Sequence, residues 1–330
     1  MRAVVIREIR NRDAVSIEEV PDPVPGPGEV RVDVRACGIN FTDLLSLDGR
    51  YQNNPPPPFT PGKDAAGVVR SIGEGVQGLA PGQRVLAHVT YGGLAERVIC
   101  PEPRCLPVPD AIDFPSAAGF GLVYLTAYFA LRVRGGLEPG QTVLVNGASG
   151  GVGLASVSLA RALGAGRVLA GLTTPAKGQA ATDAGADHLI DLSAAPLEDT
   201  LRRQVHDANR GSGADLVVDL LGGQHFGAAL RALATYGRIV VTGFAGGEIP
   251  TVRTNYLLLK NIAVVGMTLQ TFLDGHSPLL AEAQRFIFEH ALAGDLDPHV
   301  TATYRFERYM EAIRRIEDRR VIGKSVVVFD

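Results

Sequence analysis

The run Val143-Leu144-Val145-Asn146-Gly147-Ala148-Ser149-Gly150-Gly151-Val152-Gly153 decides the fold of this chain. An apolar segment of strand character ends in a glycine-rich turn, and small and apolar residues typical of a helix follow over residues 154–163. Glycine lets the backbone turn tightly and lets a pyrophosphate come close. The free N–H groups and the positive end of the helix then hold the phosphates. The run therefore predicts the phosphate-binding corner of a dinucleotide fold.

The spacing Gly147-x-x-Gly150-x-x-Gly153 departs from the strict G-x-G-x-x-G pattern, so its strand–turn–helix setting carries much of the inference. The alternative is an ordinary strand-to-helix turn in an α/β domain. The residues expected to contact the cofactor here are Gly147, Ala148, Ser149, Gly150, Gly151, Val152 and Gly153.

From about Leu137 the chain alternates between strand and helix patterns. Strands are expected at 142–145, 167–172, 188–192, 216–220, 238–244 and 261–267. Helices are expected between them, including 175–184, 197–210 and 224–234. Strands that alternate with helices predict a parallel sheet covered on both faces, and six strands match the doubly wound dinucleotide-binding fold.

The two ends of the chain follow another pattern. Residues 30–36 alternate as Val-Arg-Val-Asp-Val-Arg-Ala, which is the period of a half-buried strand. Further strands are expected at 65–72, 84–89, 300–304 and 324–329, and helices at 278–293 and 306–317. The sequence thus predicts a discontinuous β-rich domain, with the nucleotide domain inserted between its parts.

Composition excludes several classes of protein. The chain has 330 residues, 46% of them hydrophobic and 20% charged, and a net charge of -3, which is typical of a globular, soluble protein. Neither a basic stretch nor an aromatic ladder favours nucleic acid as a partner, and no apolar run reaches the roughly 18 residues that span a bilayer. The three cysteines are too few for a disulfide framework. Because the N-terminus lacks the pattern of a signal peptide, we expect a cytoplasmic location and no membrane partner.

Short motifs occur in a specific order along the chain. They are Ala36-Cys37-Gly38-Ile39-Asn40-Phe41-Thr42-Asp43-Leu44, Gly49-Arg50-Tyr51, Pro61-Gly62-Lys63-Asp64-Ala65-Ala66-Gly67, Gly73-Glu74-Gly75-Val76, Gly82-Gln83-Arg84-Val85, Leu125-Thr126-Ala127-Tyr128, Gly185-Ala186-Asp187-His188, Gly222-Gly223 and Ile322-Gly323-Lys324. Together with the glycine turn, this order resembles the medium-chain dehydrogenase/reductase superfamily, in its zinc-free quinone oxidoreductase branch.

The resemblance implies a GroES-like catalytic domain (residues 1–122 and 272–330) and an inserted Rossmann domain (residues 123–271), with the active site in the cleft between them. Zinc-dependent relatives hold their metal with a Cys and a His at the positions of Asn40 and Lys63, and a third ligand falls near Leu122. An amide, an ammonium and an alkyl chain cannot build a zinc site, so we expect no bound metal.

The cofactor is predicted from the end of the second strand of the nucleotide domain. NAD-binding folds place an Asp or Glu about 20 residues past the glycine turn, where it accepts hydrogen bonds from the ribose. This chain has no carboxylate there: Thr173 and Thr174 can donate to a phosphate, and Lys177 can bring a positive charge to it. NADPH is therefore predicted over NADH. Asp191 opposes this interpretation, because a carboxylate is unfavourable near a phosphate. The alternative for Lys177 is an ordinary solvated position on a helix.

The residues expected at the acceptor are Asn40 and Tyr51. The amide of Asn40 would donate to the acceptor carbonyl or to groups beside the nicotinamide, and its alternative role is to stabilise a turn. Tyr51 would be a second donor, or an aromatic residue packed at the rim of the cleft. Asp43 is expected to cap a helix, and Lys63 to orient the cofactor or, preferably, to form a surface ion pair with Asp64.

Four more residues complete the expected cofactor site. Thr126 matches the family threonine near the nicotinamide, and Gly243 and Phe244 follow a late strand at the carboxyl edge of the sheet. Asn255 and the stretch Leu257–Asn261 resemble a segment that reaches the nicotinamide from the domain junction.

The predicted function is NADPH-dependent reduction of a quinone or related conjugated carbonyl by metal-free hydride transfer. One alternative is an NADPH-dependent enoyl or 2-alkenal C=C reductase, whose hydride geometry is similar. Another is a nucleotide-binding structural or interaction protein with little catalysis. A homodimer is expected, because an edge strand at 261–267 would otherwise expose unpaired backbone groups. The alternative is that a loop or the 278–293 helix covers that edge.

Overall fold

The structure is a computed structural model that describes residues 1–275 and 278–330. The chain divides into two compact units. The first unit comprises Met1–Val123, Thr271–Leu292 and Pro298–Asp330, and the second comprises Tyr124–Gln270 and Ala293–Asp297. The second unit is thus inserted in sequence into the first.

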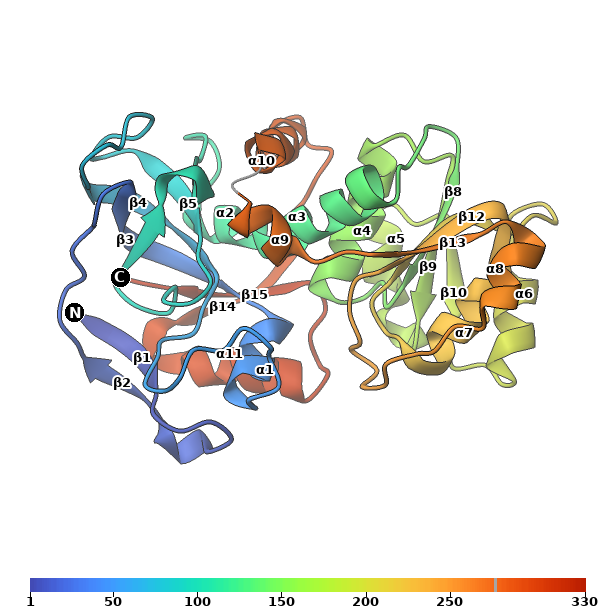
Figure 1. The fold of residues 1–330 in the computed structure, drawn as a ribbon, viewed down its shortest axis with the longest axis horizontal. Helices are drawn as coiled ribbons and strands as arrows, with labels where there is room; N and C mark the ends of the chain where they lie inside the picture. The colour runs from blue at the N-terminus through green and yellow to red at the C-terminus, as the bar shows by residue number, and fades with distance from the viewer. Residues whose placement is uncertain (276–277) are drawn as a thin grey trace. The chain divides into compact units, whose positions relative to one another are not determined.

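The second unit is built on a six-stranded parallel sheet with the strand order β10-β9-β8-β11-β12-β13 (Figure 1). The strands are β8 (Thr142–Asn146), β9 (Arg167–Leu172), β10 (His188–Asp191), β11 (Ala214–Asp219), β12 (Leu233–Val241) and β13 (Ala263–Gly266). Numbered from the first strand, this order is 3-2-1-4-5-6, which is the order of the dinucleotide-binding fold. The predicted doubly wound sheet is confirmed.

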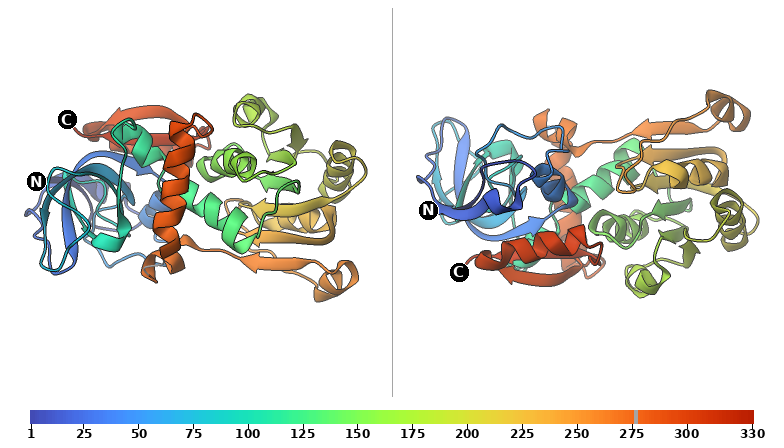
Figure 2. Two further views of the ribbon diagram at one scale, coloured as in Figure 1. Left: turned by 90° about the horizontal axis from the view of Figure 1, so that it is seen from above. Right: turned by 90° about the horizontal axis from the view of Figure 1, so that it is seen from below.

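Helices cover both faces of this sheet (Figure 2). They are α3 (Leu122–Tyr128), η3 (Phe129–Arg134), α4 (Gly151–Ala162), η4 (Pro175–Lys177), α5 (Gly178–Asp183), α6 (Leu197–Ala208), α7 (Gly223–Ala232) and α8 (Thr254–Lys260). Helix α3 begins in the first unit and continues in the second. Helix α4 is buried over Gly153–Ala160, because its small side chains let it approach β8 and β9 closely.

The first unit contains a largely antiparallel seven-stranded sheet with the order β14-β15-β3-β4-β5-β7, and β6 pairs with β3. Its strands are β3 (Glu29–Ile39), β4 (Asp64–Ile72), β5 (Arg84–His88), β6 (Arg97–Pro101), β7 (Cys105–Pro107), β14 (Val300–Arg305) and β15 (Lys324–Val328). Strand β3 alternates between buried and partly exposed residues over its first half, as the sequence predicts. Pairing with β4 and β15 brings the ends of three strands, and the polar residues on them, to one place.

The remaining helices and strands belong to the first unit, except that α9 begins in the second. They are β1 (Arg2–Ile6), η1 (Arg12–Ala14), β2 (Val15–Glu19), α1 (Phe41–Leu47), η2 (Glu102–Arg104), α2 (Phe114–Gly119), α9 (Leu269–Asp274), α10 (Pro278–Leu292), η5 (Phe306–Arg308) and α11 (Tyr309–Glu317). Strands β1 and β2 form a separate antiparallel pair. All three cysteines are buried and reduced. Over the described ranges, no helix combines the length and apolar character that a bilayer crossing requires.

Two predicted segments differ from the structure. The strand expected at 238–244 is β12, which begins at Leu233 and ends at Val241, so Gly243 and Phe244 lie in the loop beyond it. The strand expected at 261–267 is shorter and covers Ala263–Gly266. Helix α8, which the sequence analysis did not predict, precedes β13 and is exposed along one side.

Candidate functional site

The glycine turn in the second unit joins β8 to α4. Gly147 adopts a φ of +87°, which favours glycine. A Cβ at position 153 would lie 2.2 Å from the Gly147 carbonyl oxygen, so helix and turn can meet this closely only at a glycine. A Cβ at position 150, in contrast, would meet no atom within 4 Å. The space beside Gly150 is therefore open for a ligand.

The backbone amides at this turn serve two purposes: some fix the turn to the sheet, and others, at the start of α4, have no partner within the helix. The amides of Gly147 and Ala148 donate to the Gly171 carbonyl of β9, at 3.0 Å each, which fixes the turn to the neighbouring strand. Gly150 is the N-terminal cap of the twelve-residue helix α4, whose first-turn amides have no carbonyl partner within the helix. Together with the helix dipole, these amides can bind an anion such as a phosphate.

A buried polar pair, which the sequence analysis missed, lies beneath the turn at the carboxyl ends of β8 and β11. The Nδ2 atom of Asn146 donates to Oδ1 of Asp219 at 3.2 Å, and Oδ2 of Asp219 accepts from the Gly222 amide at 3.1 Å. Burial raises the pKa of Asp219, against the lowering effect of these hydrogen bonds. The pair therefore ties the glycine turn to the Gly222-Gly223 turn. The signal in the sequence was a polar residue directly after one predicted apolar strand, Asn146, and another near the end of a second, Asp219.

The second strand of the sheet ends beside the residues predicted to select the cofactor. Thr173 and Thr174 are exposed after β9, and Lys177 is partly buried in η4. Asp191 pairs in register with Leu172 and so lies at the same edge. Its carboxylate accepts hydrogen bonds from the amide and hydroxyl of Ser193, and these lower its pKa. Two hydroxyls and one ammonium are thus grouped near one carboxylate.

The remaining predicted cofactor residues are dispersed. Gly243 and Phe244 follow the carboxyl end of β12, where the next amide, that of Ala245, donates to the carbonyl of Leu220 at 2.9 Å. Thr126 is buried in α3. Asn255 lies on the exposed side of α8, at the amino end of β13.

The structure does not bring Asn255 to the edge that carries the glycine turn. Because β13 is parallel to β12, the connection from 242 to 262 must return the chain to the opposite edge before β13 begins. Helix α8 is the last part of that return. The prediction that Asn255 contacts the nicotinamide therefore has no support from this geometry.

In the first unit, Asp43 fixes the start of α1. Its Oδ2 accepts from the Asn40 amide at 2.8 Å, and its Oδ1 accepts from the Gly62 amide at 3.2 Å. Asp43 is buried, and burial raises its pKa, against the lowering effects of Lys63 and of the bond from Asn40. The predicted capping role of Asp43 is confirmed, because its carboxylate takes up the backbone N–H at the helix start.

Asp64, the first residue of β4, is the centre of a buried polar cluster. It is 0% exposed and accepts hydrogen bonds from Asn40 Nδ2 at 2.9 Å and from the Leu122 amide at 2.8 Å. The ammonium of Lys324, at the start of β15, lies 3.4 Å from its Oδ2, and His88 Nδ1 lies 3.7 Å from its Oδ1. Burial acts to raise the pKa of Asp64, but Lys324, followed by His88 and Asn40, outweighs it and lowers the pKa to about 2.

The side chain of Asn40 belongs to this cluster. Its Nδ2 donates to Asp64 and, at 3.2 Å, to the Gly38 carbonyl, while its Oδ1 accepts from the Lys324 ammonium. An amide group has two N–H donors, and here both are in use. The role of Asn40 as a donor to the acceptor carbonyl stays a prediction, and the structure gives its amide other partners.

The side chain of Lys63 does not form the surface ion pair with Asp64 that the sequence analysis preferred. It is 5% exposed, and its ammonium donates to the Thr90 carbonyl at 2.6 Å rather than to Asp64. Neighbouring residues of an extended segment point to opposite sides, so Lys63 and Asp64 cannot face each other. The predicted surface ion pair is wrong.

Two tyrosine rings border the Lys63 ammonium. The ring centroid of Tyr51 is 4.5 Å from Nζ, and that of Tyr91 is 5.4 Å from it. Burial raises the pKa of both phenols. Tyr51 was predicted as a site residue, whereas Tyr91, on the loop after β5, was missed because nothing in its local sequence marks it.

Comparison with known proteins agrees with this architecture. Residues 26–110 match the family model of the alcohol dehydrogenase GroES-like domain, and residues 151–285 match that of the zinc-binding dehydrogenase. The quinone oxidoreductase-like protein 2 of Bos taurus is 35% identical over 326 residues, which are 99% of this chain and 92% of the relative. The chain belongs to the quinone oxidoreductase-like family of the medium-chain dehydrogenase/reductase superfamily.

Two solved structures from this superfamily cover nearly the whole chain. A probable oxidoreductase from Mycobacterium abscessus has a TM-score of 0.88 and 36% identity, covering 99% of this chain and 98% of its own. The quinone oxidoreductase from Thermus thermophilus, solved also as a complex with NADPH, has a TM-score of 0.84 and 34% identity, covering 99% of this chain and all of its own. The GroES-like and Rossmann domains predicted from the sequence are thus confirmed.

The name of one matching family implies zinc. At the expected place, however, this medium-chain dehydrogenase/reductase has no set of residues that fits a zinc ion. The three positions hold Asn40, Lys63 and Leu122. The Asn40 amide is bound to Asp64 and Lys324, and the Lys63 ammonium is itself a cation. Throughout the described ranges, no group of three or more His, Cys, Asp or Glu side chains is arranged to hold a metal ion. These residue types do not suit a zinc site.

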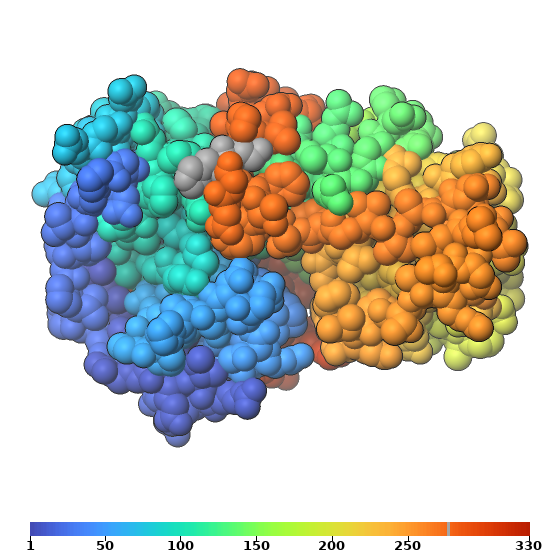
Figure 3. Space-filling view, in the orientation of Figure 1, coloured from blue at the N-terminus to red at the C-terminus, as the bar shows by residue number. Residues whose placement is uncertain are grey.

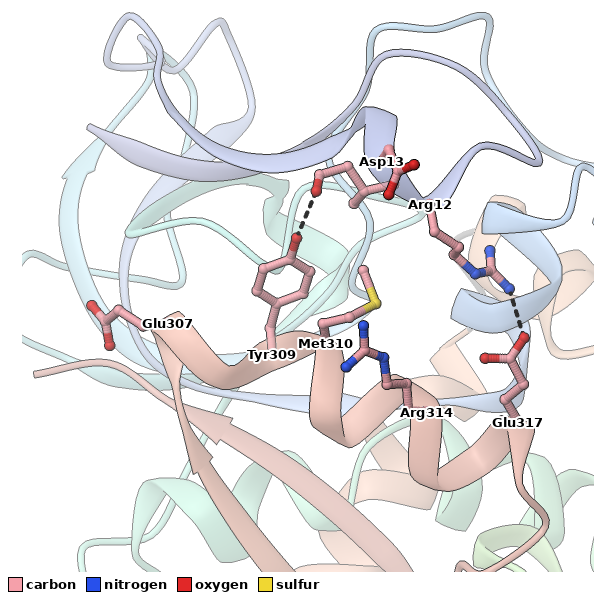
Figure 4. Close-up of a pocket in the computed structure, with 8 residues that line it drawn as sticks. Arg12, Asp13, Glu307, Tyr309, Met310, Arg314 and Glu317 are labelled. Atoms are coloured by element: carbon pink, nitrogen blue, oxygen red, sulfur yellow. Dashed lines mark hydrogen bonds and ion pairs between the residues drawn. The ribbon is translucent and has the colours of Figure 1, made fainter.

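One cavity of about 310 Å³ in this quinone oxidoreductase-like chain lies elsewhere in the first unit, between η1 and α11 (Figure 4). Arg12 points across it to Glu317, and the Tyr309 hydroxyl donates to the Val15 carbonyl at 3.1 Å. None of the predicted site residues lines it. Arg12 and Glu317 pair with each other, and Glu307 pairs with Arg2 outside the cavity, so we assign it no role in binding.

Proposed function

We propose that this chain reduces a quinone or a related conjugated carbonyl with NADPH, by hydride transfer that needs no metal. One observation carries the proposal: an amide and an ammonium, both held by buried hydrogen bonds, stand where zinc-dependent relatives have metal ligands. The glycine turn supports the dinucleotide, and the NADPH complex of the Thermus thermophilus relative supports the choice of cofactor.

The NADPH preference is proposed from the edge after β9. Thr173, Thr174 and Lys177 supply donors and a positive charge, and the carboxylate typical of NAD-binding folds is absent from this segment. Asp191 acts against a bound 2′-phosphate, but its Oδ1 is engaged by Ser193. The proposed cofactor contacts are therefore the turn residues 147–153, these three side chains, and Thr126, Gly243 and Phe244.

On the acceptor side, Tyr51 or solvent would supply the proton that completes reduction. The phenol is partly exposed near the beginning of the loop after α1, and its ring lies against the Lys63 ammonium. A reduced nicotinamide supplies hydride when it is bound. The protein then has to position the acceptor and stabilise the charge that forms on its oxygen.

Turnover with a substrate panel tests this proposal. We expect NADPH oxidation to saturate with 1,4-naphthoquinone and to exceed oxidation with a 2-alkenal. A larger rate with the alkenal would favour the enoyl or alkenal reductase instead, and saturable NADPH binding without turnover would favour a structural or interaction protein.

We also propose a homodimer through the edge of the second unit. Strand β13 pairs with β12 on one side only, and Leu258 and Leu259 of α8 are each 77% exposed. This segment lies at the surface in Figure 3. A second copy of the chain would pair the free backbone groups of β13 and cover the leucines. Sedimentation of only monomer at micromolar concentration would contradict this.

A further inference from the structure

The ammonium of Lys63 is a buried charge with few partners. Lys63 is 5% exposed, and its Nζ has three N–H donors, of which one is used by the Thr90 carbonyl at 2.6 Å. No carboxylate of the described residues lies within ion-pair distance of this ammonium. Buried charges are normally paired, so this arrangement is unusual.

The neighbouring carboxylates are engaged elsewhere. Asp43 accepts from the amides of Asn40 and Gly62, and Asp64 faces Lys324. Both still attract Lys63 over a longer distance, which acts to raise its pKa, but burial is the larger effect and lowers that pKa. With the Thr90 carbonyl as the acceptor of one N–H group, the ammonium has two further donors for an anion that reaches the site.

The chain around Lys63 is held in place by its backbone. The Lys63 carbonyl accepts from the Val89 amide at 3.0 Å, and the Gly62 carbonyl accepts from Gly93 at 3.1 Å. Gly62 has a φ of +97°, and a Cβ there would lie 2.5 Å from the Leu94 amide nitrogen. The ammonium thus projects from a fixed segment, as preorganised electrostatic stabilisation requires.

Two aromatic rings flank the same ammonium. Tyr51 and Tyr91 are partly exposed, and their centroids are 4.5 Å and 5.4 Å from Nζ. Such rings can stack on a planar conjugated ligand whose oxygen points at the charge. The cation and the two rings together fit a planar molecule with an anionic oxygen, such as a phenolate or an enolate.

We propose that Lys63 binds the oxyanion that forms on the acceptor during reduction, with Tyr51 and Tyr91 beside the acceptor ring. This inference rests on the proposed function. The acceptor gains a hydride and with it two electrons, a C–H bond of the reduced nicotinamide breaks, and the electron pair of the acceptor's conjugated system moves onto oxygen. The Lys63 N–H groups bind that oxygen and stay protonated, and Tyr51 or solvent then delivers the proton. Asn40 cannot take this role while both of its N–H groups are donated.

Binding of 4-nitrophenol tests the anion site without any turnover. Its anion absorbs visible light and resembles the monoanion of a hydroquinone. We expect the wild-type chain to bind the phenolate form in preference to the neutral phenol, and Lys63→Met to reduce phenolate affinity at least tenfold. Lys63→Arg should keep most of it, and Lys260→Met, the same change in the second unit, should have no effect.

Equal phenolate affinity of the wild type and Lys63→Met, or no binding by the wild type, would overturn the proposal. Thermal unfolding of each variant checks that it folds. Turnover of 1,4-naphthoquinone is measured in parallel: Lys63→Met should lower kcat at least tenfold with a smaller change in KM. If the wild type binds phenolate at Lys63 but reduces no quinone, the anion site stands and the proposed function fails.

Discussion

The buried pair of Asp64 and Lys324 has the largest expected effect among single side chains. Both residues are almost completely inaccessible, and the pair links the starts of β4 and β15. Lys324→Met would leave the Asp64 carboxylate buried without its cation. Removal of one partner from such a pair costs about 3–5 kcal/mol, so we expect a loss of this order in the free energy of unfolding, measured with urea.

A double variant separates the pair from general packing effects. Asp64→Asn combined with Lys324→Met removes both charges, so it should be more stable than the sum of the two single variants predicts. Strictly additive losses would show that the ion pair contributes nothing specific.

Acid stability should depend on the same carboxylate. The pKa of Asp64 is lowered from 3.8 to about 2 in the folded chain. Its contribution, roughly 2 kcal/mol, is present above pH 3.8 and is lost as the pH falls toward 2. We therefore expect the free energy of unfolding to fall more steeply between pH 4 and pH 2 in the wild type than in Asp64→Asn. Asp43, whose pKa is raised, acts in the opposite sense in both proteins. Burial is the largest cause of that raised pKa and the charge of Asp64 is the smallest, so most of the Asp43 effect is common to both. Parallel curves would refute the assignment.

At this scale, sequence motifs pointed to individual residues but not to their partners. Asn40, Asp43 and Tyr51 were singled out because they sit in motifs, and the capping role of Asp43 follows from local spacing. The partner of Asp64 is Lys324, 260 positions away, and local spacing carries no information about it. The same limit explains why Lys63 was assigned to Asp64, its sequence neighbour.

The turn between β8 and α4 offers a sharp comparison of two glycines. Gly153→Ala places a Cβ 2.2 Å from the Gly147 carbonyl oxygen, so it should destabilise the fold by about 1–3 kcal/mol and weaken NADPH binding. Gly150→Ala meets no protein atom, so stability should change by less than about 1 kcal/mol. Its Cβ enters the space proposed for phosphate, and we expect NADPH affinity to fall at least tenfold by calorimetry.

Gly227→Ala in α7 is the matched control, because its Cβ also meets open space but lies in another element. It should leave NADPH affinity unchanged. Unaltered affinity in Gly150→Ala would show that the phosphates bind elsewhere.

The segment after β9 should determine which cofactor is preferred. Lys177→Ala removes the positive charge proposed to face the 2′-phosphate. We expect kcat/KM to fall about tenfold with NADPH and to change little with NADH, since a charge-assisted contact is worth roughly 1.5–3 kcal/mol when buried and less when exposed. Equal losses with both cofactors would indicate a structural role for Lys177.

Element predictions succeeded where hydrophobic periodicity is strong. The strands β8 and β9 and helix α10 agree with their expected limits to within one residue. Helix α8 was missed because its run of three leucines has no polar face in the pattern, and two of these leucines are exposed in the structure. Asn255 belongs to that helix, and its contact with the nicotinamide stays a prediction.

At the scale of the whole molecule, the sequence predicted two units with one inserted into the other. This prediction came from two features: strand and helix patterns begin to alternate near Leu137, and strands of the first kind of domain are expected again after residue 300. The strand order of the second unit then follows from the fold class. The partner across β13 does not follow from the sequence in the same way, because an exposed edge can be covered by more than one kind of segment.

The central claim is that this chain carries out nicotinamide-dependent reduction without a metal ion. The most direct measurement is NADPH oxidation by 1,4-naphthoquinone with protein that has been stripped by a zinc chelator, before and after zinc is added back. We predict saturable turnover at the same rate in both samples. Turnover that disappears with the chelator and returns with zinc would contradict the account.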